Sequence, residues 1–243
     1  MTDGPAVIDA VRDHDVVVHL AAFTNVDGCE IEQDKARRVN AGGTENVVDA
    51  ARAAGARVVY VSTDFVFSGN KPGEYDEDDP VGPINVYGET KLQGERHLDP
   101  DIDLIIRTSW VFGDGPNFIR TILAASERGT VSVVDDQRGR PTAAAAVAGG
   151  IAHLLSDGVS GVVHVAGDGV PCSWAELAEH ALSVAGSTGT VDRIDTASYI
   201  ASVTRVVAPR PPNSTLAIDK ARSLEVPLLD WRSAVEDYIK GTR

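Results

Sequence analysis

The stretch RVVYVSTD at residues 57–64 decides the fold that this sequence predicts. Residues 58–61 are β-branched or aromatic without a polar interruption, which is typical of a strand buried on both faces of a parallel sheet. Three polar side chains, Ser62, Thr63 and Asp64, follow at the carboxyl end of this predicted strand. Open parallel sheets bind their ligands at that end. We therefore expect a functional site there, although a simple strand-to-turn transition would give the same pattern.

Strand-like and helix-like patterns alternate on both sides of this segment. Residues 15–20 (DVVVHL) and 103–108 (DLIIRT) are predicted to be further buried strands. Helical patterns cover residues 34–55, 86–98 and 117–128. Because strands that alternate with helices form parallel sheets covered on both faces, we predict an α/β fold with a doubly wound parallel sheet.

The second half of the chain is less regular. Its predicted elements are short strands at residues 131–134 and 162–166 and helices at residues 142–155 and 230–240. A further helix is predicted to begin at Ser173, because Glu176 follows at the spacing of a capping box. The proline-rich residues 208–213 predict a rigid loop.

The charge balance excludes one class of partner. The 243 residues carry 36 acidic and 22 basic side chains, a formal net charge of −14. Nucleic acids are bound through basic surfaces, so we expect no nucleic-acid partner. Hydrophobic residues make up 43% of the chain and charged residues 24%, which is typical of a globular protein and excludes general disorder.

No pattern indicates a membrane segment, a disulfide framework or a metal site. The longest apolar stretch, residues 143–155, is shorter than the roughly 20 residues that cross a bilayer. The two cysteines, Cys29 and Cys172, lie far apart, and the six histidines are scattered. The first residues lack the basic start and apolar core of a signal peptide. We expect a cytoplasmic protein with no membrane partner.

The choice of charged residues has two interpretations. Asp is twice as frequent as Glu, and 17 Arg accompany five Lys. GC-rich codon usage favours this composition. A halophilic protein also carries dense negative surface charge, which concentrated salt screens. Both interpretations stay open.

The pair Tyr87 and Lys91 carries the chemistry that this sequence predicts. Their spacing of four residues places both side chains on one face of a helix, one turn apart. A phenol titrates near pH 10, and a nearby ammonium lowers that pKa, with about 1.4 kcal/mol needed for each tenfold gain in acidity. Such a pair can pass a proton to a carbonyl oxygen while a hydride reaches the carbon. A bare Tyr-x-x-x-Lys also occurs by chance in many helices.

Further motifs accompany this pair in a defined order. They are residues 21–27 (AAFTNVD), 39–44 (VNAGGT), 62–67 (STDFVF), 87–95 (YGETKLQGE), 107–112 (RTSWVF), 117–118 (NF), 136–142 (DQRGRPT) and 210–214 (RPPNS). With them the chain resembles the dTDP-4-dehydrorhamnose reductase family of the extended short-chain dehydrogenase/reductase superfamily, over essentially its whole length. The later motifs distinguish this family from general sugar-nucleotide epimerases.

The resemblance implies a fold and a division into domains. It implies a Rossmann-like doubly wound parallel sheet, truncated at its N-terminus, with a smaller α/β substrate-binding domain. Residues 1–110 would form the NAD(P)-binding domain, and residues 111–243 would mainly form the substrate-binding domain. The strand at residues 161–166 would return to the first sheet. A homodimer is a further expectation.

The resemblance also implies roles for individual residues. Tyr87 would donate a proton to the 4-keto oxygen of the substrate, Thr63 would hydrogen-bond the same oxygen, and Lys91 would hold the nicotinamide ribose and tune Tyr87. The residues expected to line NADPH or NADH are Ala21, Ala22, Phe23, Thr24 and Val61, with Tyr87 and Lys91. The residues expected to contact the nucleotide sugar are Thr63, Asp64, Trp110, Arg140 and Arg210. Core packing is the alternative role for Trp110.

The reaction implied is the NAD(P)H-dependent reduction of dTDP-4-dehydro-L-rhamnose to dTDP-L-rhamnose. Two alternatives stay open. One is an epimerase or dehydratase of the same superfamily, which would not consume the reduced nucleotide stoichiometrically. The other is a non-catalytic NAD(P)-binding subunit, similar to the regulatory subunit of methionine adenosyltransferase.

The chain departs from the family pattern at its start. No glycine-rich turn precedes residue 15, although such a turn binds the cofactor pyrophosphate with its backbone N–H groups. Residues 1–3 are expected to be the tail of a strand, and residues 15–20 are expected to lie beside an open sheet edge. Three explanations compete: a misassigned start codon, which we favour, a truncated gene remnant, or a non-catalytic binding protein.

Overall fold

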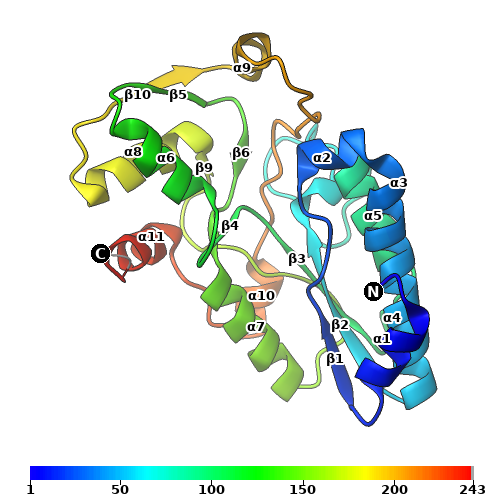
Figure 1. Ribbon diagram of the computed structural model, residues 1–243. Coiled ribbons are helices and arrows are strands. Elements are labelled where there is room, and N and C mark those ends of the chain that lie inside the picture. The colour runs from blue at the N-terminus through cyan, green and yellow to red at the C-terminus, as the bar shows by residue number, and fades with distance from the viewer. Residues whose placement is uncertain (242–243) are drawn as a thin grey trace.

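Four parallel strands in the order β1-β2-β3-β8 form the central sheet of the computed structural model, which describes residues 1–241 (Figure 1). The strands are β1 (Val16–His19), β2 (Arg57–Thr63), β3 (Leu104–Thr108) and β8 (Gly161–His164). All three neighbouring pairs are parallel, and Thr63 lies opposite Thr108. The carboxyl ends of β2 and β3 therefore meet at one edge of the sheet.

The apolar residues of β2 point alternately to the two faces of the sheet, and helices cover both faces. Val58 and Tyr60 pack with residues of α1 (Gly4–Val11) and α4 (Gly43–Ala54). Val59 packs with α7 (Ala144–Ser156) and α10 (Asp219–Ser223) on the other face. Figure 1 shows α1 and α4 on one side of the strands and α7 and α10 on the other. The doubly wound parallel sheet that the sequence predicts is confirmed.

A second group of elements packs beside the sheet and is built from the second half of the chain. Its helices are α6 (Phe118–Ser126), α8 (Trp174–Ala185), α9 (Thr196–Ser202) and α11 (Trp231–Gly241). Its strand pairs are β5 (Val131–Val134) with β10 (Val191–Ile194), β4 (Val111–Phe112) with β7 (Thr142–Ala143), and β6 (Arg138–Gly139) with β9 (Cys172–Ser173). Its core includes Phe112, Ile119, Leu177 and Trp231. The capping box of Ser173 and Glu176 is present at the start of α8.

The remaining elements follow β1 and β2. They are α2 (Val26–Ile31), α3 (Gln33–Ala36), the π-helical turn η1 (Arg37–Gly42), the 3-10 turn η2 (Asp64–Val66) and α5 (Val86–Glu95). The long helix predicted for residues 34–55 is therefore present, with a π-helical turn inside it. Within residues 1–241, no helix is long and apolar enough to cross a bilayer.

Two predictions about the start of the chain are wrong in detail. Residues 1–3 are not part of a strand, because Asp3 caps α1 with its side chain and Pro5 favours the first turn. The first strand is not fully buried, because β1 lies at the edge of the sheet, where the helices on the two faces cover Val16 and Val17 only in part. Val18 is 42% exposed and Leu20 is 62% exposed. The open edge beside this strand is as predicted.

Candidate active site

The carboxyl end of β2 turns sharply at Thr63 and Asp64. The Thr63 hydroxyl accepts a hydrogen bond from the Phe65 backbone N–H (3.2 Å) and donates one to Oδ1 of Asp64 (3.0 Å). The Ser214 hydroxyl donates a hydrogen bond to Oδ2 of Asp64. Both Asp64 and Ser214 are buried. Burial raises the pKa of Asp64 to about 7, although the hydrogen bonds from Ser214 and Thr63 lower it.

Helix α5 carries Tyr87 to this turn. The Asn85 side chain caps the helix by accepting a hydrogen bond from the Gly88 N–H (2.7 Å), and Glu30 accepts one from the Val86 N–H (2.8 Å). A Cβ on residue 88 would lie 2.1 Å from the carbonyl oxygen of Phe65. Only glycine therefore lets α5 approach the turn so closely. The structure brings the side chains of Tyr87 and Thr63 together, close enough for Thr63 to lower the pKa of the Tyr87 phenol.

Lys91 lies one turn further along α5 and is almost fully buried. Its Nζ donates a hydrogen bond to the carbonyl oxygen of Val61 (2.8 Å) and lies 4.0 Å from the centre of the Tyr60 ring. Burial lowers the pKa of Lys91 to about 7, while the Glu95 carboxylate raises it. The Lys91 ammonium is thus aimed at β2, on the same side of α5 as Tyr87.

The lowered phenol pKa that the spacing of Tyr87 and Lys91 predicts is not found. Burial raises the pKa of Tyr87 above its usual value, the Asp64 carboxylate raises it further, and only the hydrogen bond with Thr63 lowers it. Sequence spacing identified the pair but could not give its burial. Desolvation of the phenol has the largest effect on its pKa.

The segment after β1 offers a surface of small residues and is linked to α5 through Asn40, which also donates a hydrogen bond to Thr90 (3.1 Å). Asn40 holds it, because its side chain accepts from the Phe23 N–H (2.7 Å) and donates to the Phe23 carbonyl (3.2 Å). Ala21 and Thr24 are exposed, and Ala22 is half-buried. A flat ligand can therefore approach this backbone closely.

These residues fit the nicotinamide ribose half of a dinucleotide. Lys91 donates one of its three N–H groups to Val61, which leaves two N–H groups for ribose hydroxyls. The small side chains of Ala21 and Ala22 leave space beside it. Among residues 1–241, no glycine-rich strand-to-helix turn lies beside β1, so the described residues show no turn of that kind for a pyrophosphate.

A cavity of about 400 Å³ opens between the turn after β2 and the second group of elements. Five aromatic side chains form part of its wall. Trp110 stacks on Trp174, with ring centres 3.6 Å apart and planes 9° apart, and Phe118 packs against Trp174 at 4.6 Å. Phe65, whose ring meets Tyr87 edge-on at 6.0 Å, forms the wall nearest the turn. A planar or ring-shaped ligand suits such a wall.

Trp110 is held in an unusual backbone conformation. Its φ is +47°, in the left-handed region that side chains other than glycine seldom adopt. A Cβ on residue 139 would lie 2.5 Å from the Trp110 indole, so Gly139 makes room for the ring. A strained residue against a cavity is an observation that favours a role in ligand binding over simple core packing.

Arg210 and four residues with polar side-chain groups also line the cavity. Among the described residues that line it, Arg210 alone carries a charge. The other four were not identified from the sequence: Gln137, Thr196, Tyr199 and Ser214. Phe118 and Trp174 were also missed as site residues, because no local pattern distinguishes them from aromatic residues of the core.

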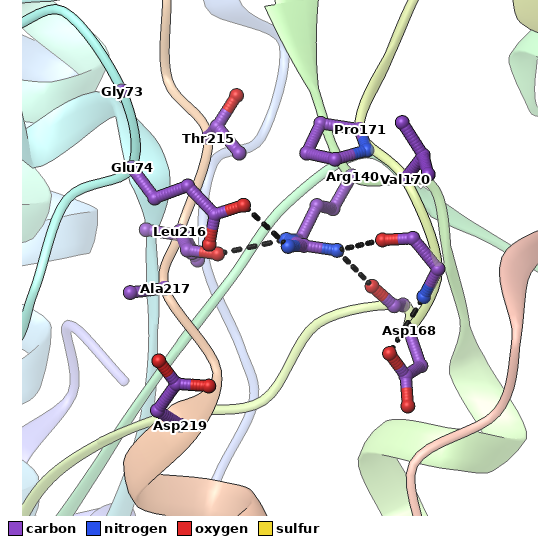
Figure 2. A network of polar contacts seen from close by, with 12 residues as sticks. Gly73, Glu74, Arg140, Asp168, Val170, Pro171, Thr215, Leu216, Ala217 and Asp219 are labelled. Carbon is purple, nitrogen blue, oxygen red and sulfur yellow. Dashed lines mark hydrogen bonds and ion pairs between the residues drawn. The ribbon is translucent and has the colours of Figure 1, made fainter.

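Arg140 lies outside this cavity. Figure 2 shows its buried guanidinium at the centre of a network. Its contacts are Glu74 (2.7 Å) and the carbonyl oxygens of Leu216 (2.9 Å), Gly167 (3.2 Å) and Gly169 (2.6 Å). Four of its five N–H groups are therefore used within the protein. The structure places Arg140 between the loops that carry Glu74, Gly167 and Leu216, and not among the described residues that line the cavity.

Comparisons with known proteins decide the family. A family profile described as the RmlD substrate binding domain matches residues 1–243. The chain belongs to this family. It is similar to a dTDP-4-dehydrorhamnose reductase of Streptomyces griseus, with 38% identity over 98% of this chain and 81% of the relative. The resemblance that the motifs indicated is confirmed.

Solved structures of the RmlD family agree with this fold. The crystal structure of a dTDP-4-dehydrorhamnose reductase from Clostridium acetobutylicum matches with a TM-score of 0.93 and 32% identity, over 99% of this chain and 86% of that one. A reductase from Bacillus anthracis in complex with NADP matches with a TM-score of 0.90 and 33% identity, over 100% of this chain and 86% of that one.

Proposed function

We propose that this protein reduces the 4-keto group of a dTDP-activated deoxysugar with NADPH, converting dTDP-4-dehydro-L-rhamnose to dTDP-L-rhamnose. One observation carries the proposal: the side chains of Tyr87 and Thr63 come together at the carboxyl end of β2, beside a cavity that five aromatic residues and one cation help to line. The names of the RmlD relatives, and the NADP bound to one of them, support the same reaction.

Each residue of the turn has a defined part in this proposal. The 4-keto oxygen accepts hydrogen bonds from Tyr87 and from Thr63, whose single hydroxyl proton turns from Oδ1 of Asp64 to the substrate. The Tyr87 proton passes to that oxygen as the carbon is reduced. Bound NADPH supplies the hydride. Lys91 holds the nicotinamide ribose with the N–H groups that Val61 leaves free, and Ala21, Ala22, Phe23 and Thr24 line the cofactor.

The cavity beyond the turn receives the rest of the nucleotide sugar. Trp110 stacks on a ring of the substrate, Asp64 contacts the sugar or holds the loop that does, and Arg210 pairs with the diphosphate. In this proposal residues 1–110 mainly bind the cofactor and residues 111–243 mainly bind the substrate.

Product analysis tests the reaction. Purified protein with NADPH and dTDP-4-dehydrorhamnose should give dTDP-rhamnose and one NADP⁺ for each sugar reduced. An epimerase or dehydratase would change the sugar without this stoichiometric oxidation. A non-catalytic subunit would bind NADPH without turnover. The assay should be run in low and in molar salt, because the net charge of −14 is screened only in the latter.

A further inference from the structure

A single carboxylate joins the two sides of the candidate site. Asp27 lies in α2, three residues after the expected cofactor segment 21–24, and its side chain is 16% exposed. It accepts hydrogen bonds from the Arg210 guanidinium (2.8 Å), the Ala208 backbone N–H (3.0 Å) and the Arg205 guanidinium. All three donors belong to residues 203–213, which we call the strap.

The strap forms part of the cavity wall. Val207, Ala208, Arg210 and Pro211 line the cavity directly. The Arg205 guanidinium also donates a hydrogen bond to the Tyr199 hydroxyl (2.6 Å), and Tyr199 lines the cavity as well. Asp27 is thus connected to three cavity residues, to Ala208 and Arg210 directly and to Tyr199 through Arg205.

Asn85 holds the strap at a second point. Its side-chain amide donates a hydrogen bond to the carbonyl oxygen of Pro209 (2.8 Å), while its oxygen caps α5. The strap is therefore fastened between the helix that carries Tyr87 and the helix that carries Asp27. Pro211 and Pro212 limit its remaining freedom.

Asp27 also sets the direction of Arg210. That guanidinium uses one N–H group on Asp27 and another on the Ala208 carbonyl oxygen (2.9 Å). The other three N–H groups have no partner among the contacts of the described residues, and the side chain borders the cavity. A planar guanidinium fixed on one edge presents its other edge for two parallel hydrogen bonds, which suits a phosphate.

We infer that Asp27 is a positioning residue for binding of the nucleotide diphosphate. Its carboxylate fastens the strap so that Arg210 and Tyr199 lie in the cavity wall. The inference rests on the proposed function for the identity of the ligand. Asp27 itself touches neither the substrate nor the cofactor. Loss of its charge should weaken substrate binding without changing the reacting groups at Tyr87 and Thr63.

The substitution Asp27→Asn tests this role, because it keeps the shape of the side chain and removes its charge. The expected results are a Kd for dTDP raised about tenfold by calorimetry and a KM for the keto-sugar raised by a similar factor. We expect kcat to stay within about threefold and the Kd for NADPH to be unchanged. Arg205→Gln should give a smaller increase, of about threefold, in both substrate constants.

Hydrogen exchange measures the fastening directly. The Ala208 amide is protected by Asp27, so peptides covering the strap should exchange faster in Asp27→Asn. Asp168→Asn is the matched control, because it removes a carboxylate that pairs with Arg222 in another part of the chain. It should change neither strap exchange nor dTDP binding. Retained NADPH binding shows that each variant is folded.

Two results would overturn the inference. One is unchanged strap exchange in Asp27→Asn, and the other is faster exchange with equal dTDP affinity. A double variant gives a further check, because Asp27→Asn should weaken dTDP binding much less once Arg210→Ala is present. Failure of the proposed function gives a different result, because the wild-type protein would then not reduce the keto-sugar. Failure of the inference alone leaves an active wild type and an Asp27→Asn variant with the same KM.

Discussion

The Ser214 hydroxyl donates a hydrogen bond to the carboxylate of Asp64, across 150 positions of sequence. This contact ties the turn that follows β2 to the loop that follows the strap. Both residues are buried, and Thr63 donates to the other carboxylate oxygen. Burial nevertheless raises the pKa of Asp64 to about 7. The connection between the two halves of the site therefore includes a group that titrates near neutral pH.

The raised pKa of Asp64 predicts a pH-dependent stability. The folded state binds the proton of the Asp64 carboxyl more tightly than the unfolded chain does. The contribution of this group to the free energy of unfolding is therefore complete below about pH 4 and is lost as the pH rises to about 7. The loss for this one group is about 4 kcal/mol at most. Asp64→Asn should lack this loss. Urea unfolding of both proteins from pH 4 to 8 checks it: the variant should gain stability relative to wild type as the pH rises, and a constant difference would contradict the prediction.

Tyr87→Phe should nearly abolish reduction. Removal of a positioned general acid lowers the rate by roughly 10²–10⁴-fold. The phenyl ring keeps its edge contact with Phe65, so the fold and the NADPH affinity should not change. NADPH oxidation with the keto-sugar measures the rate. Tyr75→Phe is the control, because its hydroxyl accepts only from the Lys71 N–H near another loop. Full turnover in Tyr87→Phe would rule out the proposed proton donor.

Much of this site could be predicted from the sequence because its signals are local. The spacing of Tyr87 and Lys91, the polar residues after β2 and the capping box at Ser173 each depend on neighbours within one or two helical turns. Helix propensity, capping and strand periodicity act over that range. The order of the motifs then gave the family.

The rest could not be predicted because it depends on contacts between distant segments. Asp27 meets Arg205 across 178 positions, and Arg140 meets Glu74 across 66. No spacing rule connects such pairs, and an arginine that holds loops has the same sequence appearance as one that holds a phosphate. The exposure of β1 was missed for a related reason, since an apolar run does not reveal its place in a sheet.

Lys91 predicts a decline of activity in alkaline solution. Its pKa of about 7 means that the ammonium that would hold the ribose loses its proton above neutral pH. In wild type, kcat/KM should therefore fall with rising pH above about 7, about tenfold per pH unit once the neutral form dominates. Lys91→Arg stays charged at every pH tested and should give a flat, lower profile. If the wild-type profile is also flat above pH 7, the charge of Lys91 is not required.

Arg140 should prove to be a stabilising residue. Arg140→Met leaves the Glu74 carboxylate and three carbonyl oxygens without their donor, and a buried acceptor left unsatisfied costs about 1–3 kcal/mol, so the variant should lose about 3 kcal/mol or more. Glu74→Gln should cost about 1 kcal/mol or less, because that carboxylate is 38% exposed and its amide oxygen still accepts. Urea unfolding measures both. If Arg140→Met is as stable as the wild type but binds dTDP poorly, Arg140 contacts the substrate and is not a stabilising residue.

Gly139→Ala tests whether the Trp110 indole serves the substrate or only the core. The new methyl group would lie 2.5 Å from the ring and must displace it from its present stacking on Trp174. Near-ultraviolet circular dichroism should report the lost stacking. If Trp110 holds a ring of the substrate, the KM for the keto-sugar should rise about tenfold, in line with an aromatic contact of about 1 kcal/mol and the distorted wall around it.

The control for this variant is a glycine with free space around it. A methyl group on Gly149, inside α7, would meet nothing closer than Pro227 at 3.9 Å, and alanine favours a helix by about 1 kcal/mol. Gly149→Ala should therefore keep the KM and raise the unfolding midpoint slightly. If Gly139→Ala loses the stacking signal and some stability but keeps the wild-type KM, Trp110 is a core residue, and the ring of the substrate must lie against another part of the aromatic wall.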